Sequence, residues 1–384
     1  MDRRAFLAAG SLAAAAGALS ASPGANASAS ANTRLFTRVD FNHDGLGLDP
    51  HEYTHLLEEA VQGDALTPDY YSLGGFVEAL ETDFAKRLGK EVAIFVPTGT
   101  LANHLAVRRL AGDDRRVLVQ ADSHLFNDSG DCAEVLSGLN LVPLGEGRAT
   151  LTLDEIEAWV ERSATGRVEN RVGVIVIEDP VRRHGHEFVD PAELARISRF
   201  ARDHGIRLHL DGARMFNLPQ HTGRSVVEHA ALFDTVYVSL WKHFNAATGA
   251  ILAGSREHLE GLFHERRRFG GALPAAWPSL APVPRFLPTY EADYARAWTI
   301  ADALFRRLEA TGRFRIARPP RGTSRVLMNV LDLDAARLVE RLAVEGIRLG
   351  LPPEGENTFT LQINTTLLRR SPDALVDAFL RAAG

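Results

Sequence analysis

The sequence predicts an α/β protein in which a mostly parallel central sheet forms a large domain, followed by a small C-terminal α/β domain. Short apolar runs alternate with longer runs whose apolar residues recur at i, i+3 and i+4, as in Pro191–Arg202. The first pattern is typical of buried strands, and the second is typical of helices that cover a sheet. With 384 residues, of which 45% are hydrophobic, the chain can fill a main core and a smaller one.

Six short apolar runs are expected to be strands of the large domain. Because parallel strands need a crossover connection, usually a helix, the alternation of these runs with helical patterns favours a mostly parallel sheet. The expected strands are Val92–Val96, Val117–Gln120, Val172–Ile177, Arg207–Leu210, Val236–Leu240 and Ala250–Ala253.

A proline-rich stretch, Leu273–Pro288, interrupts this pattern and predicts a domain boundary. We therefore expect an N-terminal segment and large domain over residues 32–284 and a small domain over 285–384. The elements expected in the small domain are the helix Tyr290–Ala310, the strand Ser324–Asp332, the helix Ala335–Glu345 and the strand Thr358–Asn364.

The N-terminus resembles an export signal. Arg3 and Arg4 precede an alanine- and leucine-rich run that ends near Leu19, and small residues typical of cleavage sites follow. This predicts a twin-arginine signal peptide over residues 1–31, and hence a periplasmic or extracellular protein. The apolar run is too short for a stable membrane anchor. The alternative is an amphipathic or disordered tail on a cytoplasmic protein.

Composition excludes several classes of protein. A net charge of −6 gives no reason to expect a nucleic-acid partner. The single cysteine, Cys132, excludes an internal disulfide framework, so we expect stability to come from packing and from a homodimer or homotetramer. The sequence has no Cys/His spacing typical of a metal site, and none is expected.

Lys242 is the first candidate for chemistry. Only three of the 43 basic residues are lysines, and Lys242 lies between two of the expected buried strands. An amine whose pKa is lowered by burial can form a Schiff base with a carbonyl, whereas an arginine cannot lose its proton. The alternative is a surface lysine whose ammonium group extends into solvent.

Two further segments would complete a site around such a lysine. Asp211 ends an expected strand 31 residues before Lys242, at the sheet edge where α/β proteins bind ligands. Its carboxylate could face the pyridinium nitrogen of pyridoxal phosphate, although a turn or helix cap is the alternative. Thr98, Gly99 and Thr100 join a strand to a helix and could bind a phosphate, or could simply cap that helix.

Together these segments resemble the threonine aldolase and β-eliminating lyase group of fold-type I pyridoxal-phosphate enzymes. The resemblance runs from about Gly63 to Gly271 and continues more weakly to the C-terminus. It implies that Lys242 carries the cofactor as an internal aldimine and that Asp211 is the partner of the pyridine nitrogen.

The resemblance also implies roles for four more residues. Arg214 would contact the phenolic oxygen of the cofactor or the substrate carboxylate. Gly99 and Thr100 would hold the phosphate, and His124 would stack on the cofactor ring.

The residues expected to contact substrate depart from the family pattern. The histidine proposed to take the substrate hydroxyl proton is replaced by Val181 or displaced to His184 or His186. The strand Phe359–Thr365 lacks the arginine with which the family grips the substrate carboxylate, and His43 stands in place of a serine.

Basic residues elsewhere are candidates for the missing anion contact. Arg182 and Arg183 follow a strand that should end at the same sheet edge, although they could equally be a solvated loop pair. Arg266–Gly271 resembles the basic stretch that reaches the partner subunit's site in this family, or is the charged end of a helix.

The sequence thus predicts a pyridoxal-phosphate-dependent carbon–carbon lyase acting on an amino acid through a Lys242 Schiff base. Threonine aldolase-like Cα–Cβ cleavage and β-elimination both remain open, with Lys242 or His124 moving protons. The alternatives are an aminotransferase or racemase of the same fold and an exported, non-catalytic protein that binds the cofactor or another ligand.

Overall fold

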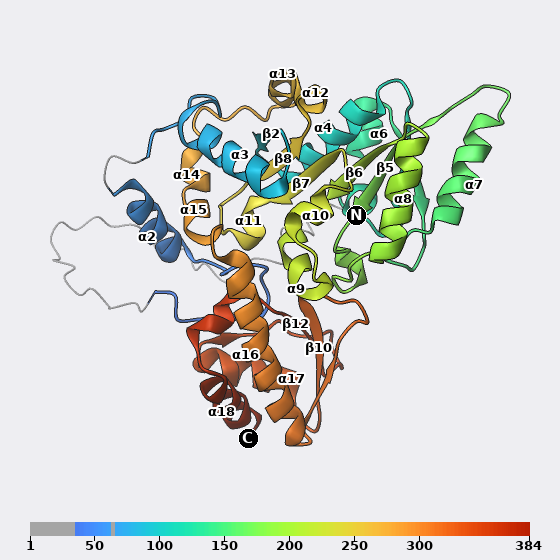
Figure 1. The fold of residues 1–384 in the computed structure, drawn as a ribbon. Coiled ribbons are helices and arrows are strands. Elements are labelled where there is room, and N and C mark those ends of the chain that lie inside the picture. Colours follow the sequence, from blue (N-terminus) through green and yellow to red (C-terminus); the bar gives the residue numbers. More distant parts are fainter. Residues whose placement is uncertain (1–34, 63–65) are drawn as a thin grey trace, which may run out of the picture. The chain divides into compact units, whose positions relative to one another are not determined.

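The computed structural model describes residues 35–62 and 66–384 (Figure 1). From Phe36 to Gly384 the chain forms one compact unit. The predicted export signal, residues 1–31, lies outside the described residues. Among the described residues, no helix has both the length and the apolar character that crossing a bilayer would require.

A seven-stranded sheet in the order β2-β8-β7-β6-β5-β3-β4 forms the centre of the large domain. All neighbouring strands are parallel except where β8 pairs with β7 and β2, so β8 alone runs against the rest. This confirms the predicted mostly parallel sheet. The strands are β2 (Val92–Val96), β3 (Arg116–Gln120), β4 (Asn140–Leu144), β5 (Val172–Glu178), β6 (Arg207–Asp211), β7 (Thr235–Ser239) and β8 (Ala250–Gly254).

Strand β4 is the strand of this sheet that the sequence did not reveal. It contains Pro143, and a proline is normally evidence against a central strand because it cannot donate to the ladder. The structure places β4 at the edge of the sheet, paired only with β3, where the missing donor costs little.

Helices cover both faces of this sheet, which explains why β5 is buried along its whole length. Alternate residues of a strand point to opposite faces, so Val174 and Val176 pack in the cluster that includes helix α4 (Gly99–Ala111). Ile175 and Ile177 belong to the larger cluster on the other face, together with Leu194 and Ile197 of helix α8 (Pro191–Asp203).

The C-terminal elements gather below the large sheet in Figure 1, and α16 runs alongside them. They contain a three-stranded antiparallel sheet in the order β12-β10-β9. Its strands are β9 (Phe314–Ala317), β10 (Arg325–Val330) and β12 (Thr358–Gln362), accompanied by α16 (Tyr290–Ala310), α17 (Ala335–Val344) and α18 (Pro372–Ala383). The predicted helices and strands of this region therefore agree with the structure to within two residues at each end.

The N-terminal segment is tied to this C-terminal sheet region. Strand β1 (Val39–Asp40) pairs with β11 (Ile347–Arg348) in parallel, and the Asn364 side-chain amide donates to the Asp40 carbonyl over 2.7 Å. The domain boundary near residue 285 remains a prediction, since Phe36–Gly384 is one unit by its contacts.

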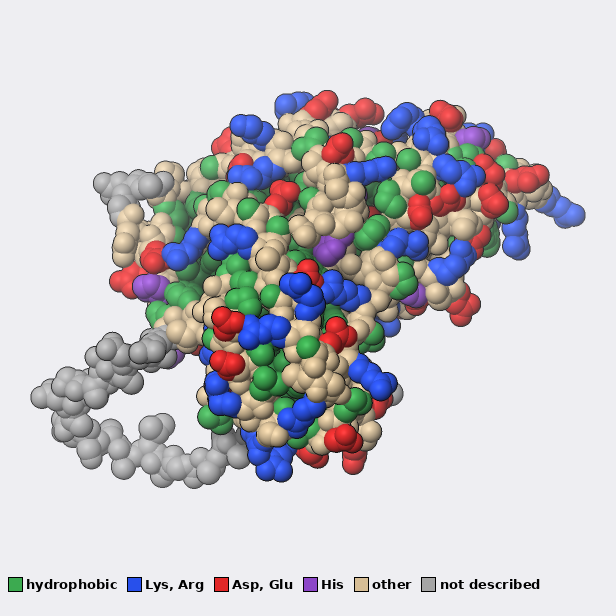
Figure 2. All heavy atoms as spheres, turned by 60° about the horizontal axis from the view of Figure 1, so that its bottom comes forward, with side chains coloured by type: hydrophobic (Ala, Val, Ile, Leu, Met, Phe, Trp, Pro, Cys, Tyr) green, Lys and Arg blue, Asp and Glu red, His purple; other side chains and the backbone are tan. Residues whose placement is uncertain are grey.

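The other helices are short or lie at the periphery. They are α2 (Pro50–Val61), α3 (Gly75–Leu88), α5 (His124–Asn127), α6 (Cys132–Ser137), α7 (Leu153–Ala164), α9 (Leu218–Thr222), α10 (Val226–Ala230), α11 (Leu240–His243), α12 (Arg256–Leu259), α13 (Leu262–Arg268), α14 (Trp277–Leu280) and α15 (Val283–Phe286), with 3₁₀ turns at Arg182–His184, Met215–Asn217 and Thr365–Arg369. On the face seen in Figure 2, acidic and basic side chains are interspersed rather than gathered by sign.

Three phenylalanines pack beneath the helix that carries Lys242. Phe244, just after α11, contacts Phe84 of α3 with ring centroids 5.5 Å apart and Phe216 with centroids 5.0 Å apart. All three rings meet edge to face and are buried, a geometry that aromatic pairs prefer. This cluster fixes the position of α11 against the large sheet.

We therefore expect Phe84→Ala to lower the free energy of unfolding by about 3–5 kcal/mol, because it removes a buried ring and leaves a cavity. Urea denaturation followed by circular dichroism measures this. The matched control is Val344→Ala, since Val344 is 90% exposed and should change stability by less than about 0.5 kcal/mol. Equal effects of the two variants would contradict the packing role of Phe84.

Candidate active site

Three strand ends of the large sheet meet at one cavity of about 380 Å³. Strand β5 ends at Glu178, β6 ends at Asp211, and the turn after β7 leads into α11 with Lys242. All three residues line the cavity, as do His124 and Arg214. The structure thus brings together, at the carboxyl edge of parallel strands, four residues that the sequence singled out separately, namely Lys242, Asp211, His124 and Arg214.

Lys242 is half-buried on α11, and its ammonium nitrogen lies 4.7 Å from the centroid of the Trp241 ring. Burial and, after it, the nearby positive charge of Arg214 lower the pKa of the Lys242 amine to about 8. A substantial fraction of this amine is therefore neutral near pH 8, which is the form that attacks a carbonyl.

Asp211 is held in place by a chain of buried polar groups. The Asn103 side-chain amide donates to Asp211 Oδ2 over 2.6 Å, and His209 Nε2 lies 3.0 Å from Asn103 Oδ1. His209 Nδ1 in turn lies 2.8 Å from Thr235 Oγ1, and burial lowers the pKa of His209 to about 4, so this ring is neutral. These hydrogen bonds orient the Asp211 carboxylate as an acceptor toward the cavity.

The Glu178 carboxylate holds the backbone of His124 in place. One carboxylate oxygen of Glu178 accepts the His124 backbone N–H over 2.6 Å, and the other accepts the Arg182 N–H over 2.8 Å. Burial and the adjacent charge of Asp211 raise the pKa of the Glu178 carboxyl to about 7. Glu178 was not among the sequence candidates, although its position at the end of the strand next to that of Asp211 was a usable signal.

Arg214 forms a buried ion pair with Asp44 from the N-terminal segment. Nε and Nη2 of Arg214 each donate over 2.8 Å to a different oxygen of Asp44, and Gln362 Nε2 also donates to Asp44 over 3.1 Å. The Arg214 guanidinium holds the pKa of the Asp44 carboxyl well below its usual range, despite burial. Arg214 thus already has a bidentate partner within the chain.

The three candidate phosphate residues lie at the N-terminus of α4, beside the residues that line the cavity rather than among them. Thr98 caps the helix by accepting the Leu101 N–H over 3.2 Å. Gly99 packs against Tyr237, a cavity-lining residue, so closely that a Cβ there would overlap the Tyr237 hydroxyl. Ser239, three residues before Lys242, has a buried hydroxyl without a regular hydrogen bond to any described residue.

The remaining sequence candidates separate into two groups. Arg182 lines the cavity, but both it and Arg183 are paired with Asp128, and Arg183 lies outside the cavity lining. His43 is half-exposed, pairs with Asp40 over 3.0 Å and lines a neighbouring cavity instead.

Of the two displaced-histidine candidates, the structure brings His186 to the cavity. His186 is buried, with Nδ1 2.8 Å from Ser324 Oγ and with no hydrogen-bond partner for Nε2 among the described residues. Burial lowers its pKa well below the usual value. His184 is paired with Asp122 over 2.6 Å, and Val181 is fully buried.

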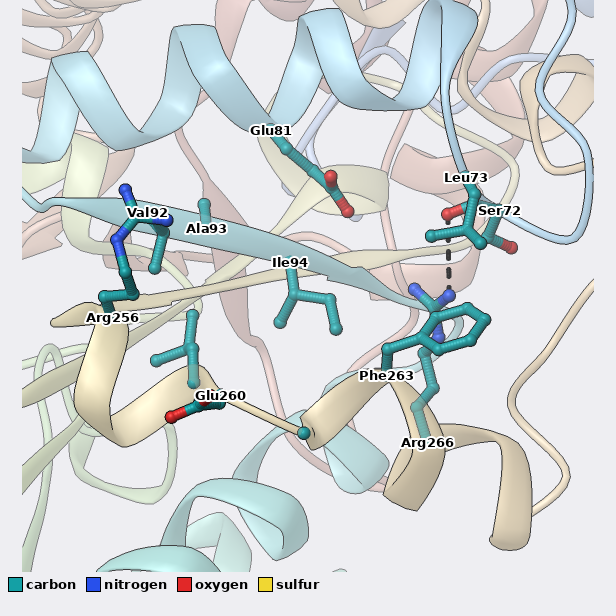
Figure 3. A pocket seen from close by; sticks show the side chains of 12 residues that line it. Ser72, Leu73, Glu81, Val92, Ala93, Ile94, Arg256, Glu260, Phe263 and Arg266 are labelled. Carbon is teal, nitrogen blue, oxygen red and sulfur yellow. Dashed lines mark hydrogen bonds between the residues drawn. The ribbon is translucent and has the colours of Figure 1, made fainter.

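A second cavity lies outside edge strand β2 (Figure 3). The Arg266 side chain lies at this cavity, where its fully buried guanidinium donates to the backbone carbonyls of Phe95 and Ser72 of the same chain. Glu81 lines the same cavity, and burial raises its pKa to about 7. Arg266 therefore stabilises the edge of the sheet. The predicted contact with a partner subunit stays a prediction for the other residues of Arg266–Gly271.

Comparison with known proteins agrees with this geometry. The sequence pattern of the beta-eliminating lyase family matches residues 54–325. The chain belongs to that family. An Arabidopsis thaliana relative, low-specificity L-threonine aldolase 1, is 25% identical over 65% of this chain and 72% of its own length. A Schizosaccharomyces pombe relative, a probable low-specificity L-threonine aldolase, is 29% identical, and the match spans 61% of each chain.

Solved structures confirm the predicted fold class of this beta-eliminating lyase family member. A Listeria monocytogenes protein assigned as an L-allo-threonine aldolase is 27% identical with a TM-score of 0.73, covering 89% of this chain and 96% of its own. A structure of SPT with PLP is 19% identical with a TM-score of 0.61, covering 90% and 87%, and supports the fold alone. The predicted family and cofactor class are thus confirmed.

The residues present fit pyridoxal phosphate. Lys242 supplies an amine whose pKa is lowered, Asp211 supplies an oriented acceptor, and Gly99 keeps the helix N-terminus close to Tyr237. The amides of Gly99 and Thr100 form no hydrogen bond with any described residue, and the Ser239 hydroxyl forms no regular one. These are the kinds of donors that a phosphate group requires.

We expect Asp44→Asn to lower the free energy of unfolding by roughly 3–5 kcal/mol at neutral pH, because it leaves the buried Arg214 charge without its partner. Since the pKa of Asp44 is lowered by folding, the ion pair contributes above the unfolded value of ~3.9. The difference between wild type and variant should therefore shrink as the pH falls below that value.

Urea unfolding of the two proteins across this pH range is the measurement. The control is Asp83→Asn, which breaks an exposed helical pair with Arg87 and should cost less than about 1 kcal/mol. A pH-independent difference, or none, would contradict the role given to Asp44.

The lowered pKa of the Lys242 amine should also appear in its reactivity as a nucleophile. We expect its acetylation by acetic anhydride in the apoprotein to rise with pH through a midpoint near 8, because the neutral fraction grows as the pH passes the pKa. Mass spectrometry of the Lys242 peptide measures the rate, with a model lysine peptide as the reference at ~10.4. A midpoint shared with the reference would show that burial does not lower this pKa.

Proposed function

We propose that this chain cleaves the Cα–Cβ bond of a β-hydroxy-α-amino acid of the threonine class with pyridoxal phosphate. The observation that carries the proposal is the meeting of Lys242 and Asp211 at one cavity, at the strand ends where this family binds its cofactor. Relatives named low-specificity L-threonine aldolase support the choice of reaction. When bound, pyridoxal phosphate supplies an electron-withdrawing ring that stabilises negative charge on the substrate Cα.

The protein residues would bind and orient the reactants. Lys242 would bond to the cofactor through its amine, and Asp211, oriented by Asn103, would accept a hydrogen bond from the protonated pyridine nitrogen. Gly99, Thr100 and the cap residue Thr98 would receive the phosphate. His124, anchored by Glu178, would cover one face of the ring.

His186 is the group best suited to take a proton from the substrate hydroxyl. A neutral imidazole whose Nδ1–H donates to Ser324 leaves the Nε2 lone pair free, and burial keeps this ring neutral. Removing the hydroxyl proton is what allows a Cα–Cβ bond to break with release of an aldehyde. Lys242, once its amine is released, could return a proton to Cα.

Assembly and location complete the proposal. We infer a homodimer or homotetramer, supported by Trp241, which is 49% exposed beside Lys242 and would lose that apolar exposure on association. Export by the twin-arginine route is supported by the paired arginines at positions 3 and 4 and the short apolar run after them.

The test uses the purified chain reconstituted with pyridoxal phosphate. We expect borohydride to fix the cofactor on Lys242, and L-threonine or L-allo-threonine to give glycine and acetaldehyde. Lys242→Ala should lower the rate by roughly 100-fold or more, because no other lysine of the described residues lines the cavity. Lys86→Ala is the matched control, since it removes an exposed lysine of α3 and should not change the rate.

Peptide mapping and product analysis identify the competing outcomes. Cofactor fixed at Lys86 or Lys90 would contradict the assignment of Lys242. Turnover that depends on an amino acceptor would indicate an aminotransferase, and loss of optical activity without aldehyde would indicate a racemase. Cofactor bound at Lys242 without turnover of any amino acid would indicate a binding protein.

A further inference from the structure

An amino-acid substrate brings a carboxylate into a cavity that must supply a cation for it. The strand on which an arginine was expected, β12, carries Gln362 at the cavity instead. Gln362 is neutral, and its amide already donates to Asp44 over 3.1 Å and to Ser324 over 2.8 Å. Another side chain must therefore receive the substrate carboxylate.

Arg325 stands directly across from Gln362. It is the first residue of β10, and the antiparallel register pairs Arg325 with Gln362. Residues that face each other across two antiparallel strands project from the same side of the sheet. Both side chains line the cavity that contains Lys242. Arg325 is thus an arginine on the neighbouring strand that lines the same wall of the site as Gln362.

The other arginines of this wall are already paired. Arg214 is bound in bidentate fashion by Asp44, and Arg182 is bound by Asp128. For Arg325, no ion pair with any residue of 35–62 or 66–384 is found, and the hydrogen bond found for its side chain is to the Arg182 carbonyl over 3.4 Å. Burial and, after it, the charge of Arg214 lower the pKa of Arg325.

We propose that Arg325 binds the α-carboxylate of the substrate, in the place of the arginine missing from β12. The inference rests on the proposed function, because it takes the ligand to be an α-amino acid. Its guanidinium can hold both carboxylate oxygens at once, which a lysine cannot. The ligand class is therefore an α-amino acid with a free carboxylate, and a simple amine should bind poorly.

The experiment uses the pyridoxal-phosphate holoenzyme and follows the cofactor absorbance as glycine is added. We expect Arg325→Gln to raise the apparent Kd for glycine by about 30-fold or more, since it removes one partner of a buried charge pair. The apparent Kd of Arg325→Lys should lie between those of the wild type and Arg325→Gln, because lysine keeps the positive charge but cannot bind both carboxylate oxygens at once. Arg315→Gln is the matched control, an exposed arginine on the adjacent strand β9 that should leave the Kd unchanged.

A relocation variant tests the placement itself. Arg325→Gln combined with Gln362→Arg should recover glycine binding at least in part, because it restores one arginine to the same wall. Competition by 3-hydroxybutanoate, which has the carboxylate but no amine, should weaken in Arg325→Gln. This competition reports on the carboxylate contact without any reaction at the cofactor.

The protein could hold the cofactor and cleave threonine without using Arg325 as the carboxylate contact. If wild type holds the cofactor on Lys242 and cleaves threonine, yet binds glycine and methylamine equally well, Arg325 does not bind a carboxylate. The same conclusion follows if Arg325→Gln keeps the wild-type Kd. If wild type does not hold the cofactor on Lys242, the proposed function itself is overturned.

Discussion

The buried ion pair between Asp44 and Arg214 is the interaction on which the site depends. It joins the N-terminal segment to the loop after β6, and Gln362 of β12 adds a third hydrogen bond to the same carboxylate. A buried pair contributes little net stability, since desolvation offsets the attraction, but its geometry is strict. Three segments far apart in sequence are therefore held in one arrangement around the cavity.

This pair also determines the role of the other charges. Because Arg214 is occupied by Asp44, its remaining influence on Lys242 is electrostatic, and together with burial it lowers the pKa of the amine. A second effect falls on Arg325, whose pKa is lowered by burial and by the charge of Arg214. Arg325 lines the same cavity as Asp211 and Lys242 and forms no ion pair with any residue that the structure describes. The neutral glutamine on β12 fits this arrangement, because an arginine there would place a further cation next to Arg214.

The sequence predicted what depends on local pattern. The strands ending at Glu178 and Asp211, the turn carrying Lys242 and the long helix α16 follow from apolar periodicity and from residue chemistry at strand ends. It left His184 and His186 open as alternatives, and it did not predict Asp44 or Arg325, because these roles depend on which distant segment each residue meets. Asp44 lies in a short polar run and Arg325 at the start of an ordinary strand, and neither position carries a local signal.

The most direct test is a crystal structure of the protein loaded with pyridoxal phosphate and soaked with glycine. We expect the glycine carboxylate to lie on Arg325 while Arg214 keeps both of its hydrogen bonds to Asp44. A glycine carboxylate held by Arg214, with Asp44 displaced and Arg325 without an anion, would contradict it.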